Sequence, residues 1–200
     1  MPPKVRFTKE DVIKAAFSIV EENGFNGMST QKVADRLNSS VQPLYSQFEN
    51  IDALKRVVAV RTQAIFRSFV LADYSERKYL NPWIGEILFA KKYSKLYFAL
   101  FVERNDHEDL FLDVNRETFN IMCDTLEFKG LDINITHAFY RHMQVYLYGL
   151  AIMVCNKYWL DDSEEGLIRV VTEQGEIMLK ATLDGLLLDR SKWPNAARRK

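Results

Sequence analysis

Apolar residues recur every three to four positions along most of the chain, which is the spacing of one face of an α-helix. The first run lies within 12–23 and consists of Val12, Ala16, Ile19 and Val20. Thr8 and Asp11 precede it as a capping-box variant, and Asn23-Gly24 follows as a stop that tolerates left-handed backbone. The pattern therefore predicts a first helix, with Phe25 folded back against the core.

Two shorter helices are predicted next. Ser29 is the expected N-cap of a helix over 30–37. The polar triplet Asn38-Ser39-Ser40 is expected to form a tight turn. Pro43 fits the first turn of a third helix over 41–48, because its missing N–H costs little there.

The remainder of the chain also has the pattern of helices. A fourth helix is expected after Asn50, and later ones are expected over 81–104, 110–129, 136–159 and 163–188. Asn81-Pro82 and Gly130 mark two of the boundaries. Because no window shows sustained β alternation, the predicted fold is all-α, with a small N-terminal helical unit followed by a larger helical domain.

Composition excludes several classes of protein. The 200 residues are 48% hydrophobic and 27% charged, as in globular rather than disordered chains. Lys plus Arg and Asp plus Glu number 27 each, so a net charge of zero excludes a polybasic tail protein and an acidic solvating chain. With only 8 Gly and 5 Pro, a turn-rich all-β fold is disfavoured.

The sequence predicts neither export nor insertion into a membrane. The N-terminal segment lacks the apolar core of a secretory signal, and the uncharged stretch 142–156 is too short to span a bilayer. We therefore expect a cytoplasmic protein without a membrane association, in which Cys123 and Cys155 are reduced.

The helices over 30–37 and 41–48 are joined by a turn short enough for a helix-turn-helix, whose second helix can enter the major groove of DNA. Gln42 can pair with an adenine edge, and Val41 can contact a thymine methyl. Three further side chains can donate to phosphate oxygens: Ser40, Tyr45 and Ser46. The alternatives are an exposed helix start for Gln42 and a packed aromatic ring for Tyr45, since such motifs also occur in bundles that never touch DNA.

An ordered run of residues within 8–60 resembles the N-terminal domain of the TetR family of one-component transcriptional regulators. The matching residues, at the family's spacing, are Gly24-Phe25, Ser29, Val33-Ala34, Leu44-Tyr45, Phe48 and Leu54. The segment 42–46 also resembles the recognition helices of some members. The resemblance implies a homodimer that binds double-stranded DNA through residues 1–65 and a small-molecule effector through a helical domain over 66–200.

Two features depart from the family's pattern. Asn38 stands where the turn usually has Gly, but Asn tolerates the left-handed conformation, so the turn is expected to form. Val41 and Gln42 stand where Lys or Gly is common. Because 41–48 contains no Lys or Arg, an operator with A/T pairs is favoured over guanine contacts.

Charge within 1–60 is nearly balanced, with eight basic and seven acidic side chains. Basic residues before the first helix and early in the fourth are expected to reach the DNA backbone, which would make the affinity fall with salt. The candidate DNA contacts are Lys4, Arg6, Ser29, Thr30, Ser40, Val41, Gln42, Pro43, Tyr45, Ser46 and Lys55.

Aromatic residues are dense after residue 80 and suit an apolar or aromatic effector held between helices. The candidate effector contacts are Trp83, Tyr93, Tyr97, Phe101, Phe119, Tyr140 and Tyr146. For each of them, a filled core is the alternative. The helices over about 136–159 and 163–188, with small residues at Gly149 and Ala151, are the candidate homodimer interface, and packing within one subunit is the alternative.

The sequence contains no recognisable catalytic or metal-binding motif. His137 and His142 are five apart, which is off the spacing for a shared metal, and no HExxH, Gly-rich phosphate loop or nucleophile elbow occurs. We therefore expect no cofactor, no metal and no enzymatic activity. The predicted function is that of a ligand-responsive repressor on a palindromic operator. The alternatives are an activator, a protein-interaction module of the same fold that has lost DNA binding, and a helical enzyme.

Overall fold

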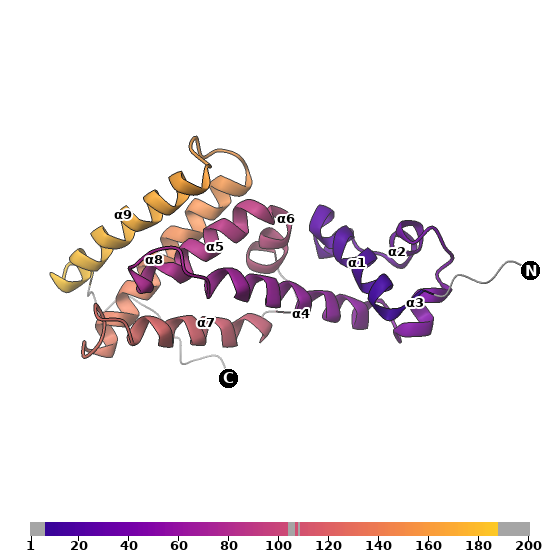
Figure 1. Ribbon diagram of the computed structural model, residues 1–200, viewed down its shortest axis with the longest axis horizontal. Coiled ribbons are helices and arrows are strands. Elements are labelled where there is room, and N and C mark those ends of the chain that lie inside the picture. The colour runs from indigo at the N-terminus through magenta and orange to yellow at the C-terminus, as the bar shows by residue number, and fades with distance from the viewer. Residues whose placement is uncertain (1–6, 104–106, 108, 188–200) are drawn as a thin grey trace, which may run out of the picture.

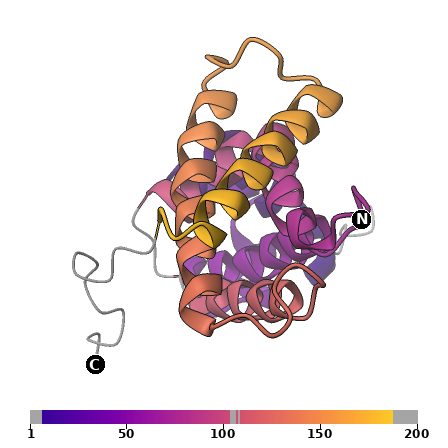
Figure 2. The ribbon, with the colours of Figure 1, turned by 90° about the vertical axis from the view of Figure 1, so that its left-hand side faces the viewer.

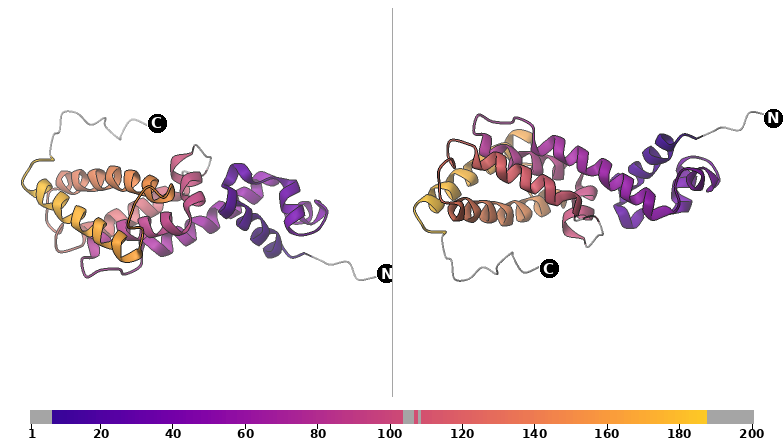
Figure 3. Two further views of the ribbon diagram at one scale, coloured as in Figure 1. Left: turned by 90° about the horizontal axis from the view of Figure 1, so that it is seen from above. Right: turned by 90° about the horizontal axis from the view of Figure 1, so that it is seen from below.

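The computed structural model describes residues 7–103, 107 and 109–187. Helices and connecting turns make up this part of the chain, with no strand in it, so the all-α prediction is confirmed. The molecule is elongated, with a small head at one end and a larger body at the other (Figure 1 and Figure 3). The head contains the helices α1 (Lys9–Asn23), α2 (Thr30–Arg36) and α3 (Gln42–Gln47), and α4 (Ile51–Val70) leads from the head into the body.

The body is formed by the second half of α4 and the helices that follow it. These are α5 (Asn81–Lys92), α6 (Ser94–Tyr97), α7 (Asp109–Cys123), α8 (Ile133–Cys155) and α9 (Glu164–Leu183). Short segments η1 (Phe25–Gly27), η2 (Lys78–Leu80) and the π-helical η3 (Phe98–Val102) complete the order. Helix α5 lies at the centre, packed against α4, α8 and α9, while α8 and α9 lie side by side (Figure 2). Of the helices described, none is both long and apolar enough to cross a membrane.

The start and end of α1 follow from local sequence. Thr8 Oγ1 accepts a hydrogen bond from the Asp11 N–H at 3.2 Å, and the Thr8 N–H donates to the Asp11 carboxylate at 2.8 Å. This is the capping box that the sequence predicts. Gly24 then ends the helix with φ of 69°, and Phe25 is buried behind it.

The helix-turn-helix is also formed by local signals. Ser29 caps α2 by accepting a hydrogen bond from the Lys32 N–H at 3.3 Å. Asn38 adopts φ of 49°, so the left-handed turn forms without glycine, as predicted. Pro43 occupies the first turn of α3, and Leu44 anchors that helix with 1% of its surface exposed.

Helix α4 joins the head to the body without a break. Asn50 caps it through a 2.8 Å hydrogen bond from the Ala53 N–H. Leu54 is buried near its start and Phe66 near its end, so one helix contributes to both parts of the core. Its last turn packs very closely against α5. The closeness is evident at Gly85, where a Cβ would collide with the Phe69 carbonyl group.

The predicted helix over 81–104 is wrong in its extent. It ends at Lys92, because Tyr93 adopts non-helical backbone angles (φ −125°, ψ 52°). The Tyr93 ring packs against Phe89 and Phe69, with centroids 5.3 Å and 6.0 Å apart. The break in the helix at Tyr93 thus coincides with tertiary packing of its ring, which the spacing of apolar residues in the sequence does not indicate.

The bounds of three other predicted helices also shift. The helix expected over 110–129 ends at Cys123 and continues as turns, in which the Phe128 N–H donates to the Thr125 carbonyl at 3.1 Å and Phe128 is buried. Because the buried Phe128 continues the helical spacing of apolar residues, the sequence pattern predicts a longer helix than the structure contains. The helices expected over 136–159 and 163–188 are α8, which begins at Ile133, and α9, which ends at Leu183. Residue 188 and the basic tail over 190–200 lie outside the described residues.

Candidate DNA interface and effector region

One face of α3 is exposed at the end of the head. Gln42, Tyr45 and Ser46 are exposed, with 55% of the Tyr45 surface accessible. Leu44 and Phe48 on the opposite side are buried, so the helix is held in place while its polar face stays open. This is the arrangement in which a helix could enter a groove of DNA.

The other predicted contacts surround α3 unevenly. Ser40 is exposed and its Oγ accepts from the Gln42 N–H at 3.4 Å, while Val41 and Pro43 are partly covered. Ser29 is exposed at the start of α2 and Thr30 is partly covered. The remaining predicted contacts are Lys55, early in α4, and Lys4 and Arg6, which lie outside the described residues.

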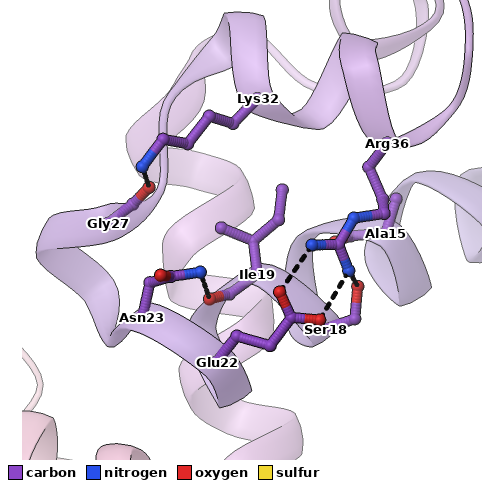
Figure 4. Close-up of polar contacts among 8 residues, drawn as sticks. All are labelled: Ala15, Ser18, Ile19, Glu22, Asn23, Gly27, Lys32 and Arg36. Carbon is purple, nitrogen blue, oxygen red and sulfur yellow. Dashed lines mark hydrogen bonds and ion pairs between the residues drawn. The ribbon is translucent and has the colours of Figure 1, made fainter.

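Basic side chains between α1 and α2 are engaged within the head (Figure 4). Arg36 donates to both carboxylate oxygens of Glu22, at 2.9 Å and 2.7 Å, and to Ser18 Oγ at 2.7 Å. This contact raises the pKa of Arg36 and lowers that of Glu22. Lys32 Nζ donates to the Gly27 carbonyl at 2.8 Å. Arg36 thus joins α2 to α1, Lys32 joins α2 to η1, and both offer little free charge to a phosphate.

Further cations of the head have partners as well. Arg61 Nη1 lies 2.7 Å from a carboxylate oxygen of Glu10, and Lys55 Nζ lies 3.4 Å from a carboxylate oxygen of Asp52. Lys9 lies over the Phe48 ring, 5.3 Å from its centroid. Such exposed contacts are individually weak, so a phosphate could displace them.

Helix α4 is tied to α7 by a row of polar contacts. Arg56 donates to both carboxylate oxygens of Asp109, at 2.8 Å and 2.5 Å. About two turns of α7 later, Arg67 donates to both carboxylate oxygens of Glu117, at 2.9 Å and 2.6 Å. Bidentate pairs fix direction as well as distance, so they set how α4, and with it the head, is aligned on the body.

The structure brings the predicted effector residues into two ring clusters and leaves one residue apart. Trp83, Tyr140 and Phe119 form the first cluster, with centroids 4.8 Å and 5.3 Å apart. Phe101 contacts Tyr97 and the Phe66 ring, while Tyr93 contacts Phe89 and Phe69, in a second cluster against α4. Tyr146 lies apart from both clusters, near Glu173 of α9. Burial is the larger cause that raises the pKa of Tyr146, and the Glu173 carboxylate is the smaller one.

Sequence reasoning missed Glu86, which lies beside both ring clusters. The Tyr97 hydroxyl donates to Glu86 Oε1 at 3.0 Å. Burial raises the pKa of Glu86 to about 7. A single acidic residue inside the apolar segment 82–90 was the signal that could have identified it.

The aromatic clusters are separate from a polar cavity at the junction of head and body. That cavity, about 330 Å³ in volume, is lined by residues of α1, of the segment from α6 to η3 and of the end of α8, among them Gly24, Lys95 and Cys155. None of the predicted effector residues lines it. Among the residues that the structure describes, no group of three or more His, Cys, Asp or Glu is placed to hold a metal ion.

The outer face of α8 and α9 carries apolar side chains that the subunit does not bury. On α8 these include Val145, 62% exposed, together with Ile152 and Met153, and on α9 they are Ile177, 61% exposed, and Leu183. Gly149 lies on the same exposed side of α8, where a Cβ would meet no atom within 4 Å. Apolar groups gathered on adjacent helices favour an interface with another protein surface.

Comparison with known proteins identifies the fold. No protein-family model matches the sequence, and no curated protein matches it. A variant of TetR from Acinetobacter baumannii AYE, determined in complex with minocycline, is 19% identical, with a TM-score of 0.53 over 90% of this chain and 98% of that one. FadR, the fatty acid degradation regulator of Bacillus halodurans, is 18% identical, with a TM-score of 0.55 over 86% of this chain and 94% of that one. The resemblance to the TetR family is thus confirmed at the level of the fold.

Proposed function

We propose that this chain is a ligand-responsive, sequence-specific DNA-binding regulator that represses transcription in the cytoplasm as a homodimer. Residues 1–65 would form the DNA-binding domain and residues 66–200 the effector-binding and dimerisation domain. Effector binding in the body would favour a dimer in which the two heads no longer match adjacent major grooves, by its difference in affinity for the two states. The TetR neighbour's complex with minocycline supports a small-molecule effector for this fold.

The observation that carries the proposal is the exposed polar face of α3. Gln42 could form a bidentate pair with adenine, and the exposed Tyr45 hydroxyl could donate to a phosphate. The Ser46 hydroxyl, which donates to the Pro43 carbonyl at 2.8 Å, would exchange that bond for one to a phosphate. The helix is short and its buried Leu44 holds it against the rest of the head, so the backbone that carries these side chains is fixed in position. With no Lys or Arg in α3, base recognition would favour A/T pairs.

The exposed apolar face of α8 and α9 supports the homodimer. A two-fold arrangement would bury Val145 against the same face of a second subunit and place α9 residues such as Ile177 beside it. Two heads arranged in this way would read half-sites about 34–36 Å apart, which implies a palindromic operator.

Selection from a random duplex library tests the proposal. Purified protein at about 100–150 mM salt should recover a palindrome with A/T pairs in each half-site. Gln42→Ala should lose preference at one position of each half-site, at a cost of about 1–3 kcal/mol. Asn120→Ala is the matched control, because Asn120 is exposed on α7, away from the head, and should leave the selected sequence unchanged.

A second candidate function is a protein-interaction module that has kept the fold and lost DNA binding. The bidentate pairing of Arg36 with Glu22 favours it, because this cation is held within the head rather than offered to a phosphate. If a folded, dimeric protein, freed of any inducer bound during expression, recovers no sequence above background, the first candidate is refuted and the second is favoured.

A further inference from the structure

The carboxyl group of Glu86 lies among aromatic side chains from three helices. The Tyr97 hydroxyl of α6 donates to it, and Trp83 lies one turn before it on the same side of α5. From α8, Tyr140 packs its ring against Trp83 with centroids 4.8 Å apart. Tyr148 of the same helix is close enough that the Glu86 carboxylate adds to burial in raising the pKa of Tyr148. These five residues are called the Glu86 cluster below.

The carboxyl group of the Glu86 cluster has no positive partner among the described residues. None of the ion pairs among the described residues includes Glu86, and no cationic side chain of this part of the chain lowers its pKa. Burying a carboxylate without a cation is costly, and an apolar side chain would fill the same place on α5 at lower cost. The arrangement therefore fits a cation supplied from outside the chain.

A second unsatisfied polar group lies in the same cluster. Trp83 is 4% exposed, and its Nε1 has no hydrogen-bond partner among the described residues. Glu86, Tyr140 and Tyr148 keep some accessible surface, whereas Trp83 and Tyr97 are buried beside them. The cluster thus offers a carboxylate, aromatic faces and one free N–H donor.

We propose that the Glu86 cluster binds the effector, and that the effector is an organic monocation of the substituted ammonium type. Glu86 would neutralise the charge, while the rings of Trp83 and Tyr140 would contact the alkyl groups on the nitrogen, because aromatic faces attract such cations. The Trp83 N–H would donate to an oxygen of the effector near its charge. In this structure Trp83 and Tyr140 pack on each other, and binding would exchange part of that contact for contact with the cation.

The site is selective by charge. A carboxylate or phosphate ligand would meet Glu86 with no neighbouring cation to offset the repulsion. The other titratable groups at the cluster are the hydroxyls of Tyr97, Tyr140 and Tyr148 and the Cys155 thiol near Tyr97. Their raised pKa values keep all of them neutral at and below pH 8. Among the described residues, α4 and α9 add no group that shifts the pKa of Glu86. Affinity should therefore follow the ionisation of Glu86 alone.

Calorimetric titration of the full chain, without DNA, tests the proposal with a matched pair of probes. Phenyltrimethylammonium and tert-butylbenzene have nearly the same shape and differ in charge. At pH 8 and at probe concentrations within the aqueous solubility of tert-butylbenzene, the cation should bind at least about tenfold more tightly than the neutral probe. Its affinity should fall by roughly tenfold for each pH unit below 7, while that of the neutral probe should not change.

Two variants identify the residue responsible. Glu86→Gln should lose about tenfold or more in affinity for the cation and keep its affinity for tert-butylbenzene. Glu76→Gln, which changes an exposed carboxyl outside the cluster, should behave as the unchanged protein. If the cation binds no more tightly than the neutral probe, or if Glu86→Gln binds it equally well, the proposal is wrong. The comparison of the two probes on the unchanged protein decides the question even if Glu86→Gln does not fold.

The inference rests on the proposed function only for its regulatory meaning. Because binding is measured without DNA, failure of cation binding leaves the proposed repressor standing with another kind of effector. Conversely, failure to select an operator would leave a monocation site in a protein that does not bind DNA. The two experiments therefore fail separately.

Discussion

Replacing Glu86 by Gln should stabilise the protein, and the gain should grow with pH. Burial raises the pKa of Glu86 from 4.5 to about 7, so the folded protein holds a proton that the unfolded chain releases over this range. The free energy of unfolding therefore falls as pH rises from about 4.5 to 7 and then levels off. This difference in pKa between the folded and unfolded states corresponds to roughly 3 kcal/mol.

The part of this free-energy difference that falls between pH 5 and pH 8 is about 2–3 kcal/mol. Gln cannot ionise, and its side-chain oxygen can still accept the hydrogen bond from Tyr97, so its burial contributes a term independent of pH. The free energy of unfolding of Glu86→Gln minus that of the unchanged protein should thus increase by about 2–3 kcal/mol across this interval. Other titrating groups cancel in the difference because both proteins contain them.

Urea unfolding followed by far-UV circular dichroism at pH 5, 6, 7 and 8 measures this difference. Protein concentration must be the same throughout, because a dimer gains apparent stability with concentration. Glu76→Gln, at an exposed position, provides the control and should give a difference that does not vary with pH. A difference for Glu86→Gln that stays constant within about 0.5 kcal/mol, or that shrinks as pH rises, would refute the buried-carboxyl argument.

Three further changes probe other parts of the structure. Gly85→Ala should destabilise the protein by about 1–3 kcal/mol in thermal unfolding, because its Cβ would collide with the backbone of α4. Gly149→Ala is the control and should not destabilise the subunit, since a Cβ there meets no atom within 4 Å. Asn38→Ala should cost about 1 kcal/mol in the same assay and Asn38→Gly should cost nothing, since the backbone there has φ of 49°; equal losses would contradict the role given to the turn. Val145→Asp should shift the protein from dimer to monomer in sedimentation velocity while its far-UV spectrum is retained, and an unchanged dimer would place the interface elsewhere.

The elements that could be predicted from the sequence are those governed by neighbours in the chain. Thr8 and Asp11 form their capping box within four residues, and Asn38 and Pro43 shape the turn and the first turn of α3 in the same local way. The apolar spacing was sufficient for the all-α fold. Such signals involve few residues, so distant contacts seldom override them.

The features that could not be predicted depend on residues far apart in the chain. The end of α5 at Tyr93 coincides with packing on Phe69, more than twenty positions away. The pairing of Arg56 with Asp109 joins residues that look like ordinary surface charges in the sequence. The exposed face of α3 was expected, but its predicted contacts with DNA and those of the aromatic residues with an effector stay predictions.

The unbroken course of α4 has a mechanical consequence. Twenty residues at about 1.5 Å per residue make a rod about 30 Å long. A tilt of about 5° at the end near Val70 would carry the end near Ile51 sideways by about 2.6 Å, nearly the length of a hydrogen bond. The bidentate pairs to α7 are placed along this rod and resist such a tilt. If a ligand moves α7 or α5 by a fraction of an ångström, the rigid α4 would therefore convert that small displacement into a larger displacement of the head, and so into a change in the distance between the two heads of a dimer.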